Sequence, residues 1–395
     1  MPPDDTGRTA TPAPEFTPAE ATPLTPADAP VSVPGAGVDL GDFRLAPALG
    51  PDPAAAEAEL GLWVWFGIVA VAFAISVLFS ETQLGLLAAA GGTFAVAHAV
   101  DRVERWRLLH HFLAGIVTAG GVVLCIATAR FIAGTPLPAL ERHLGVAASI
   151  VAALGSAALF ARPVVDALVR RLFRGAPSTH VTRLAVRMVA IALLMAAPLW
   201  VTFRGMLALD MLHDMDLGGS SLWGSLIGLT LLSLGGVGVF VRRSPVEALA
   251  RLGLTPPAGR DLLWIPLGVL ALAGLNGGVE WAQKTWFPSQ WAFDQRVVGM
   301  MAGSLTRIQS VMLGVSAGFG EELSMRGALQ PRLGLVLTAV LFAALHVQYS
   351  WTGMCTIVLF GLALGLVRMR SSTTTAIAIH AIYDMIAAFG AQQAR

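Results

Sequence analysis

Residues 61–79 read GLWVWFGIVAVAFAISVLF, a run without any charged side chain. At a rise of about 1.5 Å per residue, a helix of this length crosses the ~30 Å hydrocarbon core of a bilayer. The whole chain has the same character, since 55% of its 395 residues are apolar, only 13% are charged, and its mean hydropathy is +0.69. A soluble protein carries about 25% charged residues, so this composition predicts an all-α integral membrane protein.

Similar apolar runs continue along the chain, and we count about eleven candidate membrane spans. Their approximate extents are 61–79, 83–100, 112–129, 144–161, 184–203, 222–241, 261–281, 308–329, 333–349, 353–369 and 373–391. Arginines gather in alternate loops between the runs, as at Arg170, Arg171 and Arg174. By the positive-inside rule these loops are cytoplasmic, which predicts a cytoplasmic N-terminus and a C-terminus on the opposite side.

Composition also bears on location and on partners. Lys284 is the only lysine, a bias typical of bacterial genomes rich in G and C, so we expect a protein of the bacterial inner (plasma) membrane. The net charge is +1 and no basic patch with interleaved aromatics occurs, so nucleic acid is not an expected partner. Cys125 and Cys355 lie inside apolar runs and are expected to be small buried residues. The sequence does not indicate an oligomeric state.

Three regions follow from this pattern. Residues 1–59 are rich in Pro, Ala, Thr, Asp and Glu and lack apolar periodicity, which predicts a disordered cytoplasmic tail. Residues 60–245 hold about six spans and form an accessory transmembrane region. Residues 246–392 hold the remaining spans and all the ionisable residues discussed next.

Two adjacent carboxylates stand near the end of the run at 308–329. Ionisable residues inside a bilayer are costly, so each is a functional candidate. Glu322 and Arg326 are four residues apart on one helix face and can form an ion pair. Glu321 points about 100° away and is free for another task.

Two histidine motifs follow in the next spans. His346 comes four residues after Phe342, which we assign to packing, and His380 shares a helix face with Asp384. Counting helical rise from the turns at Arg332 and Ser371 places Glu321, His346, His380 and Asp384 within roughly 7 Å of one depth. The sequence therefore predicts one buried site, near the middle of the bilayer, that contains these four side chains.

The three motifs in this order resemble the signature of CPBP intramembrane proteases, which include the Rce1-type CAAX endopeptidases. That signature is Glu-Glu-x-x-x-Arg, then Phe-x-x-x-His, then His-x-x-x-Asn or Asp. The resemblance covers roughly residues 250–390, and it implies that residues 246–392 are a CPBP-like helical bundle with an intramembrane site. It also implies a peptidase activity, with the bilayer and a peptide or membrane-protein substrate as partners.

The resemblance implies a role for each site residue. Glu321 would be the general base that activates a water, and His346 would hold or polarise that water. His380 and Asp384 would stabilise the oxyanion or position the substrate. Arg326 would hold Glu322 in its ionised form, and Glu322 would have a secondary or structural role.

The last residue of the motif leaves the mechanism open. Many CAAX-type members have Asn where this chain has Asp384, and an ionised carboxylate cannot donate a hydrogen bond to an oxyanion. Asp384 would then need a proton, or it would be a metal ligand. Glu321, His346, His380 and Asp384 supply nitrogen and oxygen ligands that Zn²⁺ accepts, and the family is often labelled metalloprotease. Metal-assisted and metal-independent mechanisms both fit the sequence.

Two other functions fit the same residues less well. A membrane scaffold or immunity protein could keep the carboxylates only as an ion-pair cluster that locks helix packing. A proton-coupled transporter could use them as a relay, but it would more typically show repeated halves with broken helices. Small-residue spacings at Gly314-x-x-x-Gly318 and Gly361-x-x-x-Gly365 predict close helix contacts around the site in all three cases.

Overall fold

The structure is a computed structural model that describes residues 52–173, 177–211, 221–259, 261–303 and 305–393. Residues 51–395 form one compact unit. Most of the predicted disordered tail, residues 1–51, lies outside the described residues. Its last part is helical, because Pro53 stands at the first position of a helix and Asp52 accepts a hydrogen bond from the main-chain nitrogen of Ala54.

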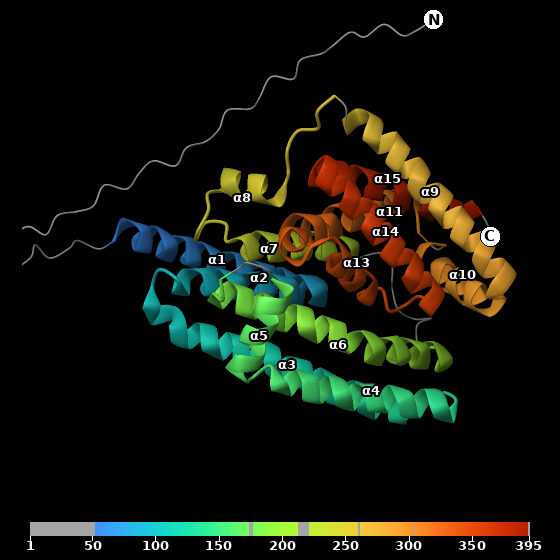
Figure 1. Cartoon of the computed structure of the whole chain (residues 1–395), viewed down its shortest axis with the longest axis horizontal. Coiled ribbons are helices and arrows are strands. Elements are labelled where there is room, and N and C mark those ends of the chain that lie inside the picture. The colour runs from blue at the N-terminus through green and yellow to red at the C-terminus, as the bar shows by residue number, and fades with distance from the viewer. Residues whose placement is uncertain (1–51, 174–176, 212–220, 260, 304, 394–395) are drawn as a thin grey trace, which may run out of the picture. The chain divides into compact units, whose positions relative to one another are not determined.

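The described residues fold into helices without a β-strand (Figure 1). The helices are α1 (Pro53–Phe79), α2 (Thr82–Val100), η2 (Glu104–Trp106), α3 (Arg107–Ala133), α4 (Ala139–Ala158), α5 (Arg162–Leu172), α6 (His180–Ala208), α7 (Ser221–Val237), α8 (Pro245–Leu252), α9 (Asp261–Trp286), α10 (Pro288–Ala302), α11 (Arg307–Val315), η3 (Ser316–Glu321), η4 (Leu323–Leu329), α12 (Gln330–Leu333), α13 (Leu335–Ala344), α14 (Trp351–Arg370) and α15 (Thr373–Gln393). The all-α polytopic fold predicted from composition is confirmed.

Helix length and composition do not confirm the expected count of about eleven spans. Within the described ranges, seven helices are long and apolar enough to cross a membrane, or up to eight if α4 and α5, bent by 100°, count as one span. The seven are α1, α2, α3 with η2, α6, α9, α14 and α15. The expected spans at 222–241, 308–329 and 333–349 are helical but short or divided, because α7 and α13 end early and the run at 308–329 changes from α- to π-helix.

The expected helix at 333–349 differs most from the structure. Helix α13 ends at Ala344, so His346 lies in a turn and not on a helix. The side chain of His346 bonds the carbonyl of Phe342, and Ser350 already caps the next helix by accepting from the nitrogen of Gly353. The short helices α5, α8 and α10 lie outside the expected spans, because each is too short or too polar to resemble one.

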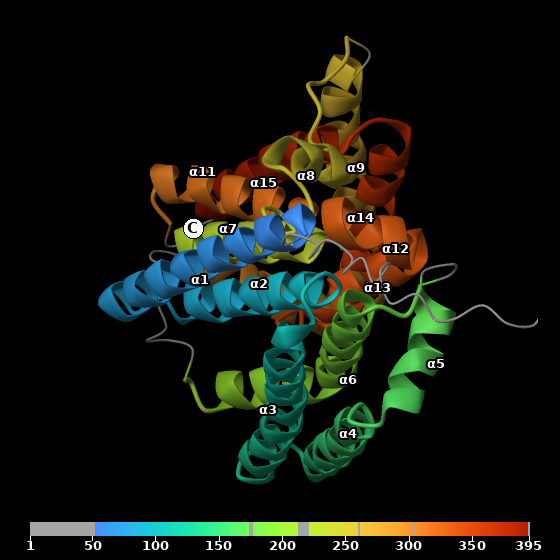
Figure 2. The same ribbon diagram turned by 90° about the vertical axis from the view of Figure 1, so that its left-hand side faces the viewer.

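The helices of the N-terminal region pack in two groups (Figure 2). Helix α2 lies between α1 and α7, and the buried indole of Trp65 donates to the carbonyl of Val239 at 2.9 Å. Helices α3 and α4 pair with each other and contact α6. Of the two cysteines, Cys125 is buried as expected, whereas Cys355 is exposed.

The π-helical stretch η3–η4 packs between α7 and α15. The hydroxyl of Ser316 donates to the carbonyl of Leu222, and Ser324 bonds Ser233 at 2.9 Å. Helix α7, counted with the accessory region in the sequence analysis, therefore contacts the C-terminal part directly.

Glycines allow close contact of α15 with α11 and η3, and of α14 with α13. A Cβ atom added at Gly314 or Gly318 would lie 2.5 Å from the carbonyl oxygen of Ala381 and 2.6 Å from its nitrogen, respectively. A Cβ at Gly361 would lie 3.0 Å from the Cα of Ala339 on α13. The predicted close packing at the small-residue spacings is confirmed, and it brings α15 against η3.

Replacing Gly318 by Val should disrupt this contact. The new Cβ meets main-chain atoms, which cannot move as a flexible side chain can, so we expect a loss of about 1–3 kcal/mol in the free energy of unfolding, or failure to fold. Unfolding in detergent would measure it. Gly274→Val is the matched control, because no atom lies within 4 Å of a Cβ added there. Equal stability of the two variants would contradict the assignment.

Candidate active site

A buried carboxylate, Glu322, stands between two cations. Its Oε1 lies 3.0 Å from Nη1 of Arg326 and 2.9 Å from Nδ1 of His380. The side chains of Glu322 and Arg326 are 0% and 1% exposed, so this ion pair is shielded from solvent. An ionised carboxylate only accepts hydrogen bonds, so Nδ1 of His380 carries a proton. The contact joins η4 to α15.

Arg326 extends this buried layer to two more helices. Its Cζ lies 4.6 Å from the ring centroid of Phe342 on α13, a cation–π distance. Its Nη2 donates to the carbonyl of Gly361 on α14 at 3.3 Å. Phe342, expected only to pack, therefore covers the charged group that holds Glu322.

A second layer can be reached from outside the protein. The side chains of Glu321, His346 and Asp384 are 26%, 20% and 24% exposed. Nε2 of His346 lies 3.9 Å from Oε2 of Glu321, too far for a direct hydrogen bond. Asp384 connects the layers, because its Oδ2 lies 3.3 Å from Nε2 of His380.

Glu321 is the carboxylate of the site that lacks protein partners. Its Oε2 is covered yet accepts no hydrogen bond from any described residue. Oε2 of Glu322 and Nε of Arg326 also lack partners, but those side chains are inaccessible. Since a quarter of the Glu321 side chain is exposed, its carboxylate can meet a reactant.

The main chain fixes the tautomer of His346. Its Nδ1 lies 2.8 Å from the carbonyl oxygen of Phe342, and a carbonyl only accepts, so Nδ1 carries the proton. In its neutral form the ring therefore presents an unprotonated Nε2 toward Glu321. Its ring also lies 4.6 Å from the ring of Phe342 and stacks at 6.5 Å on Tyr349.

The structure thus brings all six candidate residues into one connected group. Glu321, Glu322 and Arg326 come from the π-helical stretch, His346 from the turn after α13, and His380 and Asp384 from α15. The contact between Glu322 and His380 was not expected from the sequence, which assigned Glu322 only to Arg326.

The residues do not fit a zinc site as they stand. Among the described residues, no three His, Cys, Asp or Glu side chains converge as metal ligands. Both ring nitrogens of His380 face carboxylates, at 2.9 and 3.3 Å, so neither offers a lone pair. His346 has only Nε2 available.

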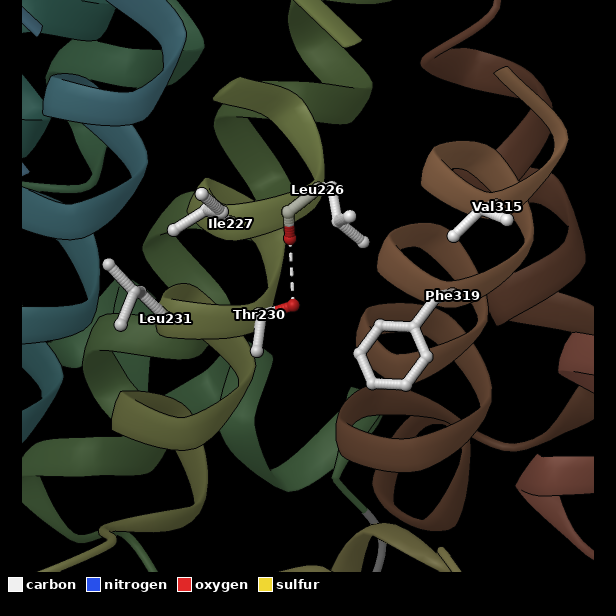
Figure 3. Close-up of a pocket in the computed structure, with 6 residues that line it drawn as sticks. All are labelled: Leu226, Ile227, Thr230, Leu231, Val315 and Phe319. Carbon is white, nitrogen blue, oxygen red and sulfur yellow. Dashed lines mark hydrogen bonds between the residues drawn. The ribbon is translucent and has the colours of Figure 1, made fainter. Parts of the chain in front are cut away.

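An apolar pocket opens on another part of the π-helical stretch (Figure 3). None of the six candidate residues lines it. The hydroxyl of Thr230 is used within α7, donating to the carbonyl of Leu226 at 2.7 Å. The lining residues are Leu226, Ile227, Thr230, Leu231, Val315 and Phe319.

Comparison with known families finds one match, to the Rce1-like family described as type II CAAX prenyl endopeptidase Rce1-like. The match covers residues 303–386. The match confirms the resemblance seen in the three motifs, and all six candidate residues lie inside it. In general terms, the Rce1-like domain is that of an intramembrane endopeptidase acting on a membrane-associated substrate. No curated protein and no solved structure matches the chain.

Breaking the buried ion pair of the Rce1-like domain should be costly. Arg326→Met leaves Glu322 charged and buried, and we expect a loss of about 3–5 kcal/mol in the free energy of unfolding. Adding Glu322→Gln should recover part of that loss, since an amide oxygen can still accept from His380. Unfolding of the purified protein in detergent measures both changes.

The control is an exposed pair of the same kind. Nη1 of Arg107 lies 2.8 Å from Oε1 of Glu104, and both side chains are more than half exposed. Arg107→Met should cost less than about 1 kcal/mol. A double variant no more stable than Arg326→Met alone would contradict the assignment.

Proposed function

We propose that the chain hydrolyses a peptide bond of a membrane-associated substrate, with Glu321 as the general base. The observation that carries this proposal is the pairing of an accessible carboxylate lacking protein partners with a histidine of fixed tautomer, 3.9 Å away. The buried charges of Glu322 and Arg326 neutralise each other and are not available to a reactant. Glu321 is therefore the carboxylate that can act on a reactant.

A water beside Glu321 would be oriented by two acceptors. It donates one hydrogen to the Glu321 carboxylate and the other to Nε2 of His346, so a lone pair faces the substrate carbonyl. Glu321 takes one proton as the oxygen attacks the carbonyl carbon. The same proton then passes to the leaving amine as the carbon–nitrogen bond breaks, which returns Glu321 to its ionised form.

The oxyanion formed in this attack needs positive charge or a donor. With both nitrogens facing carboxylates, His380 is doubly protonated and carries a positive charge. That positive charge, positioned by the contact between His380 and Glu322, would stabilise the oxyanion. A proton on Oδ1 of Asp384, with Oδ2 still accepting from His380, would add a hydrogen bond to the oxyanion, and the metal-ligand role is not used, since the donor set does not fit zinc.

The substrate class follows from the setting of the site. In a bacterial inner membrane, with the N-terminus cytoplasmic, we expect a peptide precursor or another membrane protein as the substrate. The scaffold alternative has less support, because an ion-pair cluster that serves only packing gives no reason for a covered oxygen of Glu321 without a hydrogen bond, which is destabilising.

Glu321→Gln should abolish most of the activity. The amide cannot take a proton from water, so cleavage of a membrane-tethered reporter peptide should fall about 10²–10⁴-fold while the fold is kept. Glu280→Gln is the control, a membrane-region carboxylate paired with Lys284 at 3.0 Å. Undiminished cleavage by Glu321→Gln would refute the general-base role. A wild type that cleaves nothing and still complements a deletion strain would favour the scaffold.

Asp384→Asn and Asp384→Ala should differ. Asn can accept from Nε2 of His380 through its oxygen and donate to the oxyanion through its nitrogen, so we expect reporter cleavage within about 10-fold of the wild type. Ala provides neither bond, and a fall of about 10²–10³-fold is expected.

If the activity requires a metal, the two Asp384 variants should no longer differ. An amide is a poor zinc ligand, so Asn would then be as inactive as Ala. Purified wild-type protein should keep its activity in a strong chelator and hold no stoichiometric metal by elemental analysis. Loss of activity in chelator that added Zn²⁺ restores would instead support the metal mechanism.

A further inference from the structure

The catalytic candidate His346 lies outside a helix, although its Nδ1 bonds the carbonyl of Phe342 on α13. It follows the end of α13 and belongs to the turn at residues 345–350. At the start of the turn, the main-chain nitrogens of Leu345 and His346 bond carbonyls of α13, and further along the nitrogen of Tyr349 bonds the carbonyl of His346. The ring of His346 also stacks on Tyr349, so the distance between Nε2 of His346 and Glu321 depends as well on what holds the far end of the turn.

That far end is held by a buried aspartate of α10. Oδ1 of Asp294 accepts from the main-chain nitrogen of Ser350 at 2.6 Å, and Oδ2 accepts from its hydroxyl at 2.7 Å. Oδ2 also accepts from the amide of Gln283 on α9 at 3.0 Å, and the same amide donates to Thr352 at 2.9 Å. Asp294, Gln283 and Ser350 are all buried, so these bonds are protected from competing water.

A second contact comes from the accessory region. Nε1 of Trp200 on α6 donates to the carbonyl of Tyr349 at 2.9 Å, and the ring of Tyr349 stacks on His346. The turn is thus held on one side by α10 and on the other by α6. Trp200 and Asp294 both lie outside residues 303–386, the range that matches the Rce1-like family.

We propose that Asp294 is a positioning residue for the hydrolysis, and that it sets His346 against Glu321 by anchoring Ser350. The inference rests on the proposed function, since it assumes that His346 orients the water. Asp294 touches neither Glu321 nor His346. It acts through the turn, so its loss should reduce the rate of the chemical step more than substrate binding.

A purely structural role for Asp294 predicts a different result. If it only caps α14 and packs α10, its loss lowers stability and leaves the rate of the folded enzyme intact. Asp261 provides the comparison, since it is also buried and makes similar bonds, accepting from the nitrogen of Ala258 at 2.7 Å and the hydroxyl of Ser371 at 2.6 Å. It lies at the start of α9, whereas Gln283 lies near its end.

The test compares Asp294→Asn with Asp261→Asn in full-length protein, using the tethered reporter peptide. Asn at 294 places an NH₂ group where Ser350 or Gln283 donates, so the anchor is broken. We expect kcat to fall about 10–100-fold with KM within about threefold of the wild type. Asp261→Asn should keep the wild-type kcat while losing a comparable amount of thermal stability.

A milder pair of variants covers failure of Asp294→Asn to fold. Ser350→Ala removes the hydroxyl bond to Asp294 and a helix cap, and Ser244→Ala removes the matching cap of α8. We expect kcat to fall about 3–10-fold in the first and to stay unchanged in the second. Wild-type kcat in every folded variant at 294 and 350 overturns the inference.

Glu321→Gln, assayed in parallel, separates the two proposals. If Glu321→Gln is inactive and the Asp294 and Ser350 variants are as fast as the wild type, only the positioning role fails. If Glu321→Gln remains active, the proposed general base is wrong, and the inference about Asp294 fails with it.

Discussion

The buried carboxylate of Glu322 is the constraint on which the site depends. It is fully buried, with Arg326 at 3.0 Å and His380 at 2.9 Å. In a low-dielectric interior a carboxylate is tolerated only when it is paired, so η4 and α15 cannot separate without a large loss of stability. This contact fixes the rotation of α15 and thereby the place of Asp384, one turn further along the helix.

The charged side chains of the site form two layers. In the buried layer, the charges of Glu322 and Arg326 neutralise each other, and Glu322 contacts His380. In the partly exposed layer, the carboxylate of Glu321 has no protein donor. A reactive carboxylate in a membrane needs charged neighbours such as those of the buried layer, because an isolated carboxylate would lose its charge or destabilise the fold. The close glycine contacts between η3 and α15 bring the two layers within reach.

The sequence predicts the local part of this arrangement well. Pairs four residues apart, Glu322 with Arg326 and His380 with Asp384, depend only on helical geometry. Their contacts across helices depend on how each helix is rotated, which composition does not encode, and so the bond from Glu322 to His380 was not foreseen. The depth estimate brought Glu321 near His346 although His346 lies beyond the end of its helix.

Other parts of the fold could not be predicted from hydropathy. The short helix α10 carries Asp294 in a stretch too polar to resemble a span, and a single aspartate gives no sign of the three donor groups it joins. The available signal was modest: a carboxylate directly after Phe293 and three residues after Trp291, in a chain with few charges. The expected count of about eleven spans is not confirmed, because apolar run length does not distinguish a crossing helix from a shorter buried one.

The π-helical form of residues 316–329 makes the site sensitive to chain length. A π-helix closes its hydrogen bonds over one more residue than an α-helix, so it behaves as an α-helix with residues inserted. Loss of one residue here would leave hydropathy almost unaltered, and the segment could still enter a membrane. It would turn everything on one side of the deletion by about 100° relative to the other. Insertions and deletions, and not only substitutions, are therefore a route by which such a domain can lose its chemistry and keep its place in the bilayer.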